Sequence, residues 1–193
     1  MSRGMKEEDQ MRVSEALEEA FYVSIDTMLP TSISTGCKDG DIKKVKAWLG
    51  NGGSINAEDP HGETLLHAAC SVAETMQHVE IVEVLIRRGA DVNQRQSYTG
   101  GKTPLMAVAQ SSGSCGAEIA LRLMAAGARR EDKTTDDSKT AVQLAKIKKD
   151  ELQEQPEKER GLQRVIDAIS NRDAAPAIKD AERRAKEAES DNV

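Results

Sequence analysis

Aromatic residues are scarce in this chain of 193 residues, which contains one Phe, one Trp and two Tyr. Apolar residues make up 38% of the sequence, so any core must be built mainly from Ala, Leu, Ile and Val. This composition disfavours a β-sandwich, whose strands are rich in aromatic and β-branched residues, and favours stacked helices with small side chains. The length suits one ordinary domain with terminal extensions.

Cysteines and long apolar runs are also few. Cys37, Cys70 and Cys115 are widely separated and form no Cys-x-x-Cys pair, so we expect no disulfide framework and a reducing intracellular environment. The opening MSRGMKEEDQ lacks the apolar segment of a secretory signal, and the nearby run AFYV is too short to cross a bilayer. We therefore expect a cytoplasmic protein with no membrane insertion, and a nuclear location is also open.

The chain has no strong excess of either charge. Its 27 basic and 33 acidic residues are interspersed, and the formal net charge is −6. A nucleic-acid-binding surface would instead need clustered basic residues. We therefore expect no nucleic-acid partner.

The stretch Gly100-Gly101-Lys102-Thr103 resembles part of a phosphate-binding loop. Such a loop needs an apolar strand and a further glycine five residues before the Gly-Lys pair. That position is Gln96, and the preceding GADVNQRQS is polar and turn-like. Both requirements fail, so the sequence predicts no nucleotide site here.

Two phrases recur along the chain at a shared spacing. One is a Thr followed by apolar and small residues: TLLHAA (64–69), TPLMAV (103–108) and TAVQLA (140–145). The other carries a glycine after an apolar segment: VKAWLGNGGSIN (45–56), VEVLIRRGADVN (82–93) and ALRLMAAGARRE (120–131). The threonines are 39 and 37 residues apart, and Gly52, Gly89 and Gly127 are 37 and 38 apart. Two independent markers in step predict a repeat array with insertions in its loops.

These phrases resemble the ankyrin repeat. Its helix-ending phrase matches Gly89-Ala90-Asp91-Val92-Asn93, and its Thr-Pro-Leu-His opening matches 64–67 and 103–106 with single departures. The resemblance covers about 33–171. It implies an all-α solenoid of four helix-turn-helix units (33–60, 61–98, 99–136 and 137–171) with projecting β-turn or hairpin fingers. Segments 1–32 and 172–193 would flank this domain with terminal helices.

Local signals support the repeat assignment. Thr64, Thr103 and Thr140 are expected to cap helices through their hydroxyls, and the three glycines to close second helices in a left-handed backbone. The spacing of apolar residues predicts a helix over 79–88 that buries one face against neighbouring repeats. In the first unit, Asp41 should cap the second helix, with Val45, Trp48 and Leu49 in the core.

The last unit departs furthest from the pattern. Its first helix, from Thr140, is expected to run on until Pro156 interrupts it. The finger before it reads Arg129-Arg130-Glu131 where Asp-Val-Asn is expected. This finger could therefore be irregular.

The two ends carry charged helical patterns. Residues 5–29 have an apolar stripe that ends at Pro30 and either caps the first repeat or docks in a partner's groove. Residues 174–189 are charged all round and suit a solvent-exposed helix. The final Ser-Asp-Asn-Val weakly resembles a C-terminal PDZ ligand.

Catalytic and metal-binding constellations are weak. His67, Cys70 and His78 provide only three candidate ligands, and His67 matches the family's histidine that ties finger to helices. Residues 132–143 resemble a calcium loop but lack its glycine and its final glutamate. A thiol enzyme built on Cys70 or Cys115 is a further alternative. We expect a non-enzyme with no cofactor and no metal.

The favoured function is a non-catalytic protein–protein interaction module, an adaptor or scaffold; the alternative is a permanent structural subunit of a larger assembly. The resemblance implies that partners bind at the fingers and the first-helix starts, which here are Glu58, Asp59, His61, Glu63, Gln94, Arg95, Gln96, Tyr98, Lys102, Asp132, Lys133, Asp136 and Lys139. Tyr98 is the only aromatic residue among them and the favoured anchor. Replacing Tyr98 and Gln96 by Ala is expected to weaken binding with little loss of stability.

Overall fold

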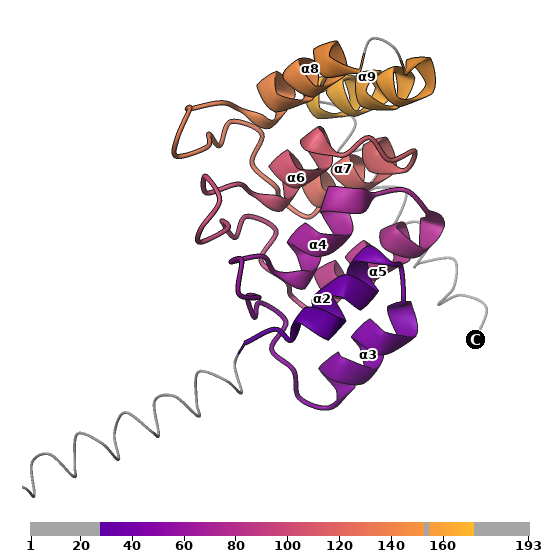
Figure 1. The fold of residues 1–193 in the computed structure, drawn as a ribbon, viewed down its shortest axis with the longest axis vertical. Helices are drawn as coiled ribbons and strands as arrows, with labels where there is room; N and C mark the ends of the chain where they lie inside the picture. The colour runs from indigo at the N-terminus through magenta and orange to yellow at the C-terminus, as the bar shows by residue number, and fades with distance from the viewer. Residues whose placement is uncertain (1–27, 153–154, 172–193) are drawn as a thin grey trace, which may run out of the picture.

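The computed structural model describes residues 28–152 and 155–171 as a stack of helix pairs (Figure 1). In chain order the helices are α2 (Thr31–Lys38), α3 (Ile42–Gly50), α4 (Leu65–Val72), α5 (Met76–Arg87), α6 (Pro104–Gln110), α7 (Gly116–Ala125), α8 (Ala141–Glu151) and α9 (Pro156–Ser170). The described part has isolated β-bridges but no β-strand, so the predicted all-α solenoid is confirmed. None of its helices has the length and apolarity needed to cross a bilayer. The helix expected over 5–29 falls almost wholly outside the described residues, and the one expected over 174–189 falls wholly outside them.

The helices form two layers. Successive first helices α2, α4, α6 and α8 pack on one another, and so do successive second helices α3, α5, α7 and α9. The three connections between pairs project from the same side of the stack, on the left in Figure 1. This arrangement buries the apolar face of each helix between repeats, as a solenoid requires.

The core lies between the two layers and is built from small and branched side chains. In α5, Ile81, Val82 and Leu85 are fully buried, as the helical spacing predicts, although the helix begins at Met76 rather than at 79. Val45 is also fully buried. Trp48 and Leu49, which are also expected in the core, are only half-buried, and Trp48 packs against Gly53.

The helix ends follow the repeating phrases with one exception. The hydroxyls of Thr64 and Thr140 accept hydrogen bonds from backbone N–H groups in the first turn of α4 and α8. Thr103 is the N-cap of α6, but its buried hydroxyl has no hydrogen-bond partner. The predicted N-cap position of Thr103 is therefore confirmed, but the hydrogen bond expected of its hydroxyl is not formed. Asp41 caps α3 as predicted, by accepting a bond from the Lys44 amide at 3.0 Å.

The predicted glycine C-terminal signals are confirmed by backbone angles. Gly52, Gly89 and Gly127 follow second helices with φ values of 91°, 86° and 100°. This left-handed conformation suits glycine, which has no Cβ to clash with the neighbouring carbonyl.

Pro156 begins a helix rather than interrupting one. Helix α8 ends at Glu151, and Pro156 is the first residue of α9. The prediction that α8 continues to Pro156 is therefore wrong. A proline is tolerated at a first helical position because its missing N–H would have no partner there in any case.

The insertions of the second and third units bind each other on the side opposite the fingers. Helix α4 is followed by its C-cap, Ala73, which is fully buried and left-handed with φ 50°. The Ser111 hydroxyl donates to the Val72 carbonyl oxygen at 2.6 Å, and the Cys115 amide donates to the Ala73 carbonyl oxygen at 2.9 Å. The Ser114 hydroxyl donates to the Glu74 carbonyl oxygen at 2.8 Å. These segments therefore form an inter-repeat clasp, residues 72–74 with 111–115.

Candidate protein-interaction surface

Three loops form the projecting fingers: finger 1 (52–63), finger 2 (89–102) and finger 3 (127–139). Each is closed by one backbone hydrogen bond across its base: Asp59 N to Glu63 O at 2.9 Å, Gln96 N to Lys102 O at 2.9 Å, and Thr134 N to Lys139 O at 3.0 Å. Finger 3 also carries a bridge between Lys133 and Thr140, like the bridge in finger 1. The Arg-Arg-Glu substitution therefore leaves the finger closed at its base.

Asparagines of the recurring phrase tie each finger to the next. The Asn56 side-chain oxygen accepts a bond from the Asp91 amide at 2.9 Å. One repeat later, the Asn93 side-chain oxygen accepts a bond from the Arg129 backbone amide at 2.9 Å. The Asn93 side-chain NH2 group donates to the Gly127 carbonyl oxygen at 3.1 Å. These bonds fix the spacing between finger bases.

Polar side chains of finger 2 extend this network on both sides. Gln94 donates to Glu58 of finger 1 at 2.9 Å. The Arg95 guanidinium donates to the carbonyl oxygens of Gly101 at 2.8 Å and Lys133 at 2.7 Å. The fingers are thus one hydrogen-bonded unit, and a rigid unit loses little conformational entropy when a partner binds.

Asp59 and Gln96 lie inside the finger unit. Asp59 is 4% exposed, and its carboxylate accepts bonds from the Ser34 hydroxyl at 3.0 Å and from the His61 and Glu63 amides. Gln96 is 7% exposed and donates to Glu63 at 3.0 Å. We therefore leave both out of the contact set proposed below. We now expect Gln96→Ala to reduce stability, contrary to the expectation from the sequence.

The other expected contact residues reach the surface to different extents. Glu58, Glu63, Gln94, Lys102, Asp132 and Lys139 are half-buried. His61, Arg95, Tyr98, Lys133 and Asp136 are exposed. With 76% of its surface exposed, Tyr98 is the most exposed large apolar side chain of the described residues.

The fingertips lie against one another. A Cβ placed on Gly62 would be 3.0 Å from Cδ2 of Tyr98, so the phenol ring packs on the tip of finger 1. A Cβ on Gly100 would be 2.7 Å from the Asp136 carboxylate oxygens, so this carboxylate lies on finger 2. The Thr135 amide donates to the Gly100 carbonyl at 3.0 Å. His61, Tyr98 and Asp136 therefore belong to one continuous surface, which we call the fingertip row.

His67 joins helix α4 to finger 2 through a hydrogen bond of its imidazole ring. Its Nε2 lies 3.0 Å from the Lys102 carbonyl oxygen, which only accepts, so Nε2 carries the proton. Nδ1 is then the acceptor for the Thr64 hydroxyl at 2.9 Å. Burial lowers the pKa of His67 from its usual value, with smaller opposing effects from its hydrogen bonds and from nearby carboxylates. The neutral imidazole is therefore the form that stabilises the fold.

We expect acid to remove this contribution. Because the folded-state pKa of His67 lies below the unfolded value of about 6.5, the stabilisation is complete above pH 6.5. It is lost as the pH falls through the folded-state pKa. Urea unfolding of the wild type between pH 8 and pH 5 should show this loss, and the His67→Met variant should show a shallower decline. Equal slopes would contradict the assignment of a neutral, structural His67.

His78 repeats this arrangement and was not predicted. Its Nδ1 lies 2.7 Å from the Thr75 hydroxyl, and its Nε2 lies 2.9 Å from the Lys38 carbonyl oxygen of the preceding repeat. The signal in the sequence was Thr-x-x-His at 75–78, the same spacing as at 64–67. It was missed because the helix was expected to begin at residue 79, after this phrase.

The histidines considered as candidate metal ligands have structural roles. Both ring nitrogens of His67 and His78 have partners within the protein. In residues 28–152 and 155–171, no three His, Cys, Asp or Glu side chains are placed to hold a metal ion. Burial raises the pKa of Cys37 to about 12 and the pKa of Cys70 well above its usual value. Neither thiol is suited to act as a nucleophile, because the thiolate is the reactive form.

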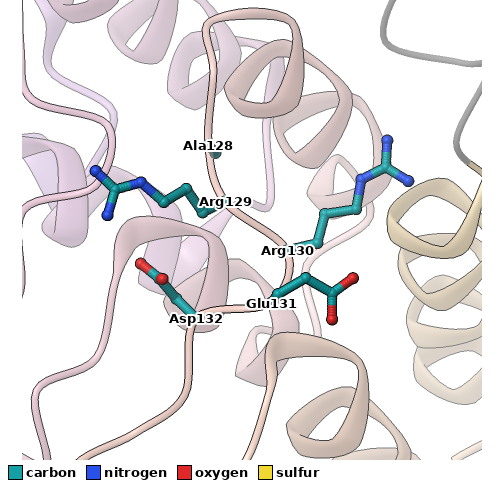
Figure 2. A pocket seen from close by; sticks show the side chains of 5 residues that line it. All are labelled: Ala128, Arg129, Arg130, Glu131 and Asp132. Carbon is teal, nitrogen blue, oxygen red and sulfur yellow. The ribbon is translucent and has the colours of Figure 1, made fainter.

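An open hollow lies at the start of finger 3, lined by residues 128–132 (Figure 2). Arg129 and Asp132 project to one side of the backbone, and Arg130 and Glu131 project to the other. Asp132 also faces Arg95, with 3.8 Å between the charged groups. With two basic and two acidic side chains, the hollow has no net charge that would select a ligand of one sign.

Comparison with known proteins agrees with this geometry. The family model for ankyrin repeats, in three copies, matches residues 33–136, more than half of the chain. An ankyrin repeat protein of Fowlpox virus (strain NVSL) is 42% identical over 59 residues, which cover 31% of this chain and 11% of the relative. An ankyrin repeat-containing protein of Schizosaccharomyces pombe (strain 972 / ATCC 24843) is 36% identical over 74 residues, which cover 38% of this chain and 33% of the relative. The matches thus span a third or less of either relative. Given the matching family model and the observed helix pairs and fingers, the chain belongs to the ankyrin repeat family.

Proposed function

We propose that this protein is a non-catalytic adaptor or scaffold that binds a protein partner through the fingertip row. Ankyrin repeats are in general protein–protein interaction modules. The observation that carries the proposal is Tyr98, which is 76% exposed and lies between Ser97 and Thr99, both of which form hydrogen bonds within the finger unit. A rigid aromatic side chain on a fixed backbone provides contact area at low entropic cost.

The proposal also covers the location of the protein, its ligands and the residues beside Tyr98. The repeat array would act in the cytoplasm or nucleus, without a cofactor and without binding nucleic acid. Arg95 and Lys133 would contribute polar contacts beside Tyr98, since both are exposed on the finger unit. A permanent structural subunit would instead dock through the terminal segments and the insertions. Of these, residues 1–27 and 172–193 lie outside the described residues.

Tyr98→Ala is expected to weaken binding of the partner about tenfold or more, because truncating an interface anchor commonly costs over ~1 kcal/mol. The partner would be captured from cells with the tagged full chain, identified by mass spectrometry and purified. Its affinity for each variant would then be measured by calorimetric titration. Thermal unfolding of Tyr98→Ala should match that of the wild type, since the ring is exposed.

Met76→Ala is the matched control. Met76 is 64% exposed and begins α5, at the end of the helices away from the fingers. Its truncation removes a large apolar side chain but should leave the affinity unchanged. An unaltered affinity in Tyr98→Ala would refute the fingertip row, and a loss in Met76→Ala alone would move the interface to the opposite side.

A further inference from the structure

Tyr98 and Asp136 are an exposed aromatic side chain and an exposed carboxylate on neighbouring fingers. The Asp136 carboxylate oxygens lie against Gly100, two residues beyond Tyr98, at 2.7 Å from where a Cβ would stand. Both side chains are exposed. The backbone bond from Thr135 N to Gly100 O holds the two fingertips together at this point. The two side chains are therefore exposed on neighbouring fingers of one hydrogen-bonded unit.

Asp136 also differs from the neighbouring carboxylates in its bonding. Glu58, Asp59 and Glu63 accept hydrogen bonds within the finger unit. Asp132 faces Arg95, and Asp137 is paired with Lys139 at 2.8 Å and bonded to Thr134. In residues 58–63 and 131–137, every acidic side chain except Glu131 and Asp136 is thus engaged within the described structure. Asp136 itself makes no hydrogen bond or ion pair there, whereas Asp137 beside it does.

We infer that Tyr98 and Asp136 together bind an arginine side chain from a basic segment of the partner, an inference that rests on the proposed function. The guanidinium would stack on the exposed phenol ring and donate two N–H groups to the Asp136 carboxylate. Arginine fits this pair better than lysine does, because its planar guanidinium can stack and form a bidentate pair at once. The partner segment is thus identified by charge complementarity to the unpaired carboxylate.

Selection of short random peptides displayed against the immobilised full chain tests this inference directly. We expect the selected peptides to be enriched in arginine. Labelled copies of the best peptide would then be titrated against each variant. Asp136→Asn should weaken binding about three- to tenfold, and added salt should weaken binding to the wild type more than binding to Asp136→Asn.

Asp137→Asn is the matched control, because it removes the same formal charge one residue away from a carboxylate that is already paired with Lys139. Its affinity for the peptide should stay within about twofold of the wild type. Changing the selected arginine to glutamine should cost much less in Asp136→Asn than in the wild type, because the two groups contact each other. Additive losses would overturn the proposed pair.

The remaining outcomes separate this inference from the proposed function. Peptides that lack basic residues but lose binding in Tyr98→Ala would overturn the arginine site and leave the fingertip row as an interaction surface. Peptides insensitive to both Tyr98→Ala and Asp136→Asn would contradict both. Competition by a synthetic peptide of residues 172–193, which contains Arg183-Arg184, would assign the surface to the chain's own segment and overturn a partner site.

Discussion

Replacing Gly113 by alanine is expected to lower the free energy of unfolding by about 2–4 kcal/mol. A Cβ at this position would lie 2.3 Å from the carbonyl oxygens of both Val72 and Ala73. These are backbone atoms, and they are held by hydrogen bonds from Ser111 and Cys115. The clash can only be relieved by separating the two repeats at the clasp, and forced separation of packed elements is costly. Urea unfolding followed by circular dichroism measures the difference.

Gly50→Ala provides the matched control for this substitution. Gly50 is the last residue of α3, and a Cβ there would meet no atom within 4 Å. Alanine is the better helix former, so this variant should be as stable as the wild type or more stable by up to about 1 kcal/mol. If Gly113→Ala unfolds at the same urea concentration as Gly50→Ala, the clasp does not hold the second and third repeats together.

The repeat architecture could be predicted because its signals are local. Glycines with a left-handed backbone and a capping threonine need no partner elsewhere in the chain to be recognised. Their common spacing then indicated stacked units. The insertions could not be interpreted in the same way, because the clasp joins 72–74 to 111–115 and these two segments share no recurring phrase.

The burial of the polar finger residues could not be predicted from the sequence. Asp59 and Tyr98 lie in similar loops, yet Asp59 is 4% exposed and Tyr98 is 76% exposed. An aspartate whose carboxylate accepts hydrogen bonds from neighbouring amides and an aspartate that faces solvent cannot be told apart in the sequence. The distinction between Asp136 and Asp137 likewise depends on whether Lys139 and Thr134 reach the side chain. Only the folded arrangement of the fingers separates structural polar groups from candidate contacts.

His67 and Met106 are the third residues of α4 and α6. Replacing each by the other, in two separate variants, should change the free energy of unfolding in opposite directions. His67→Met is expected to lower the free energy of unfolding by about 2–3 kcal/mol. The substitution removes the donor to the Lys102 carbonyl and the acceptor for the Thr64 hydroxyl in a fully buried position. Urea unfolding at pH 8, where the imidazole is neutral, gives the full effect. A loss below about 0.5 kcal/mol would show that His67 contributes little to joining the finger unit to the helices.

The reciprocal substitution, Met106→His, should stabilise the protein by about 1 kcal/mol. Met106 occupies the position in α6 that His67 occupies in α4, and the Thr103 hydroxyl beside it is buried without a hydrogen-bond partner. A histidine there can accept from this hydroxyl through Nδ1. Its Nε2–H is then directed to the Lys139 carbonyl, which closes finger 3 as the Lys102 carbonyl closes finger 2. The gain should disappear as the pH falls below about 6.5, because protonation removes the Nδ1 acceptor. A gain that persists at pH 5 would point to improved packing rather than to a restored hydrogen bond.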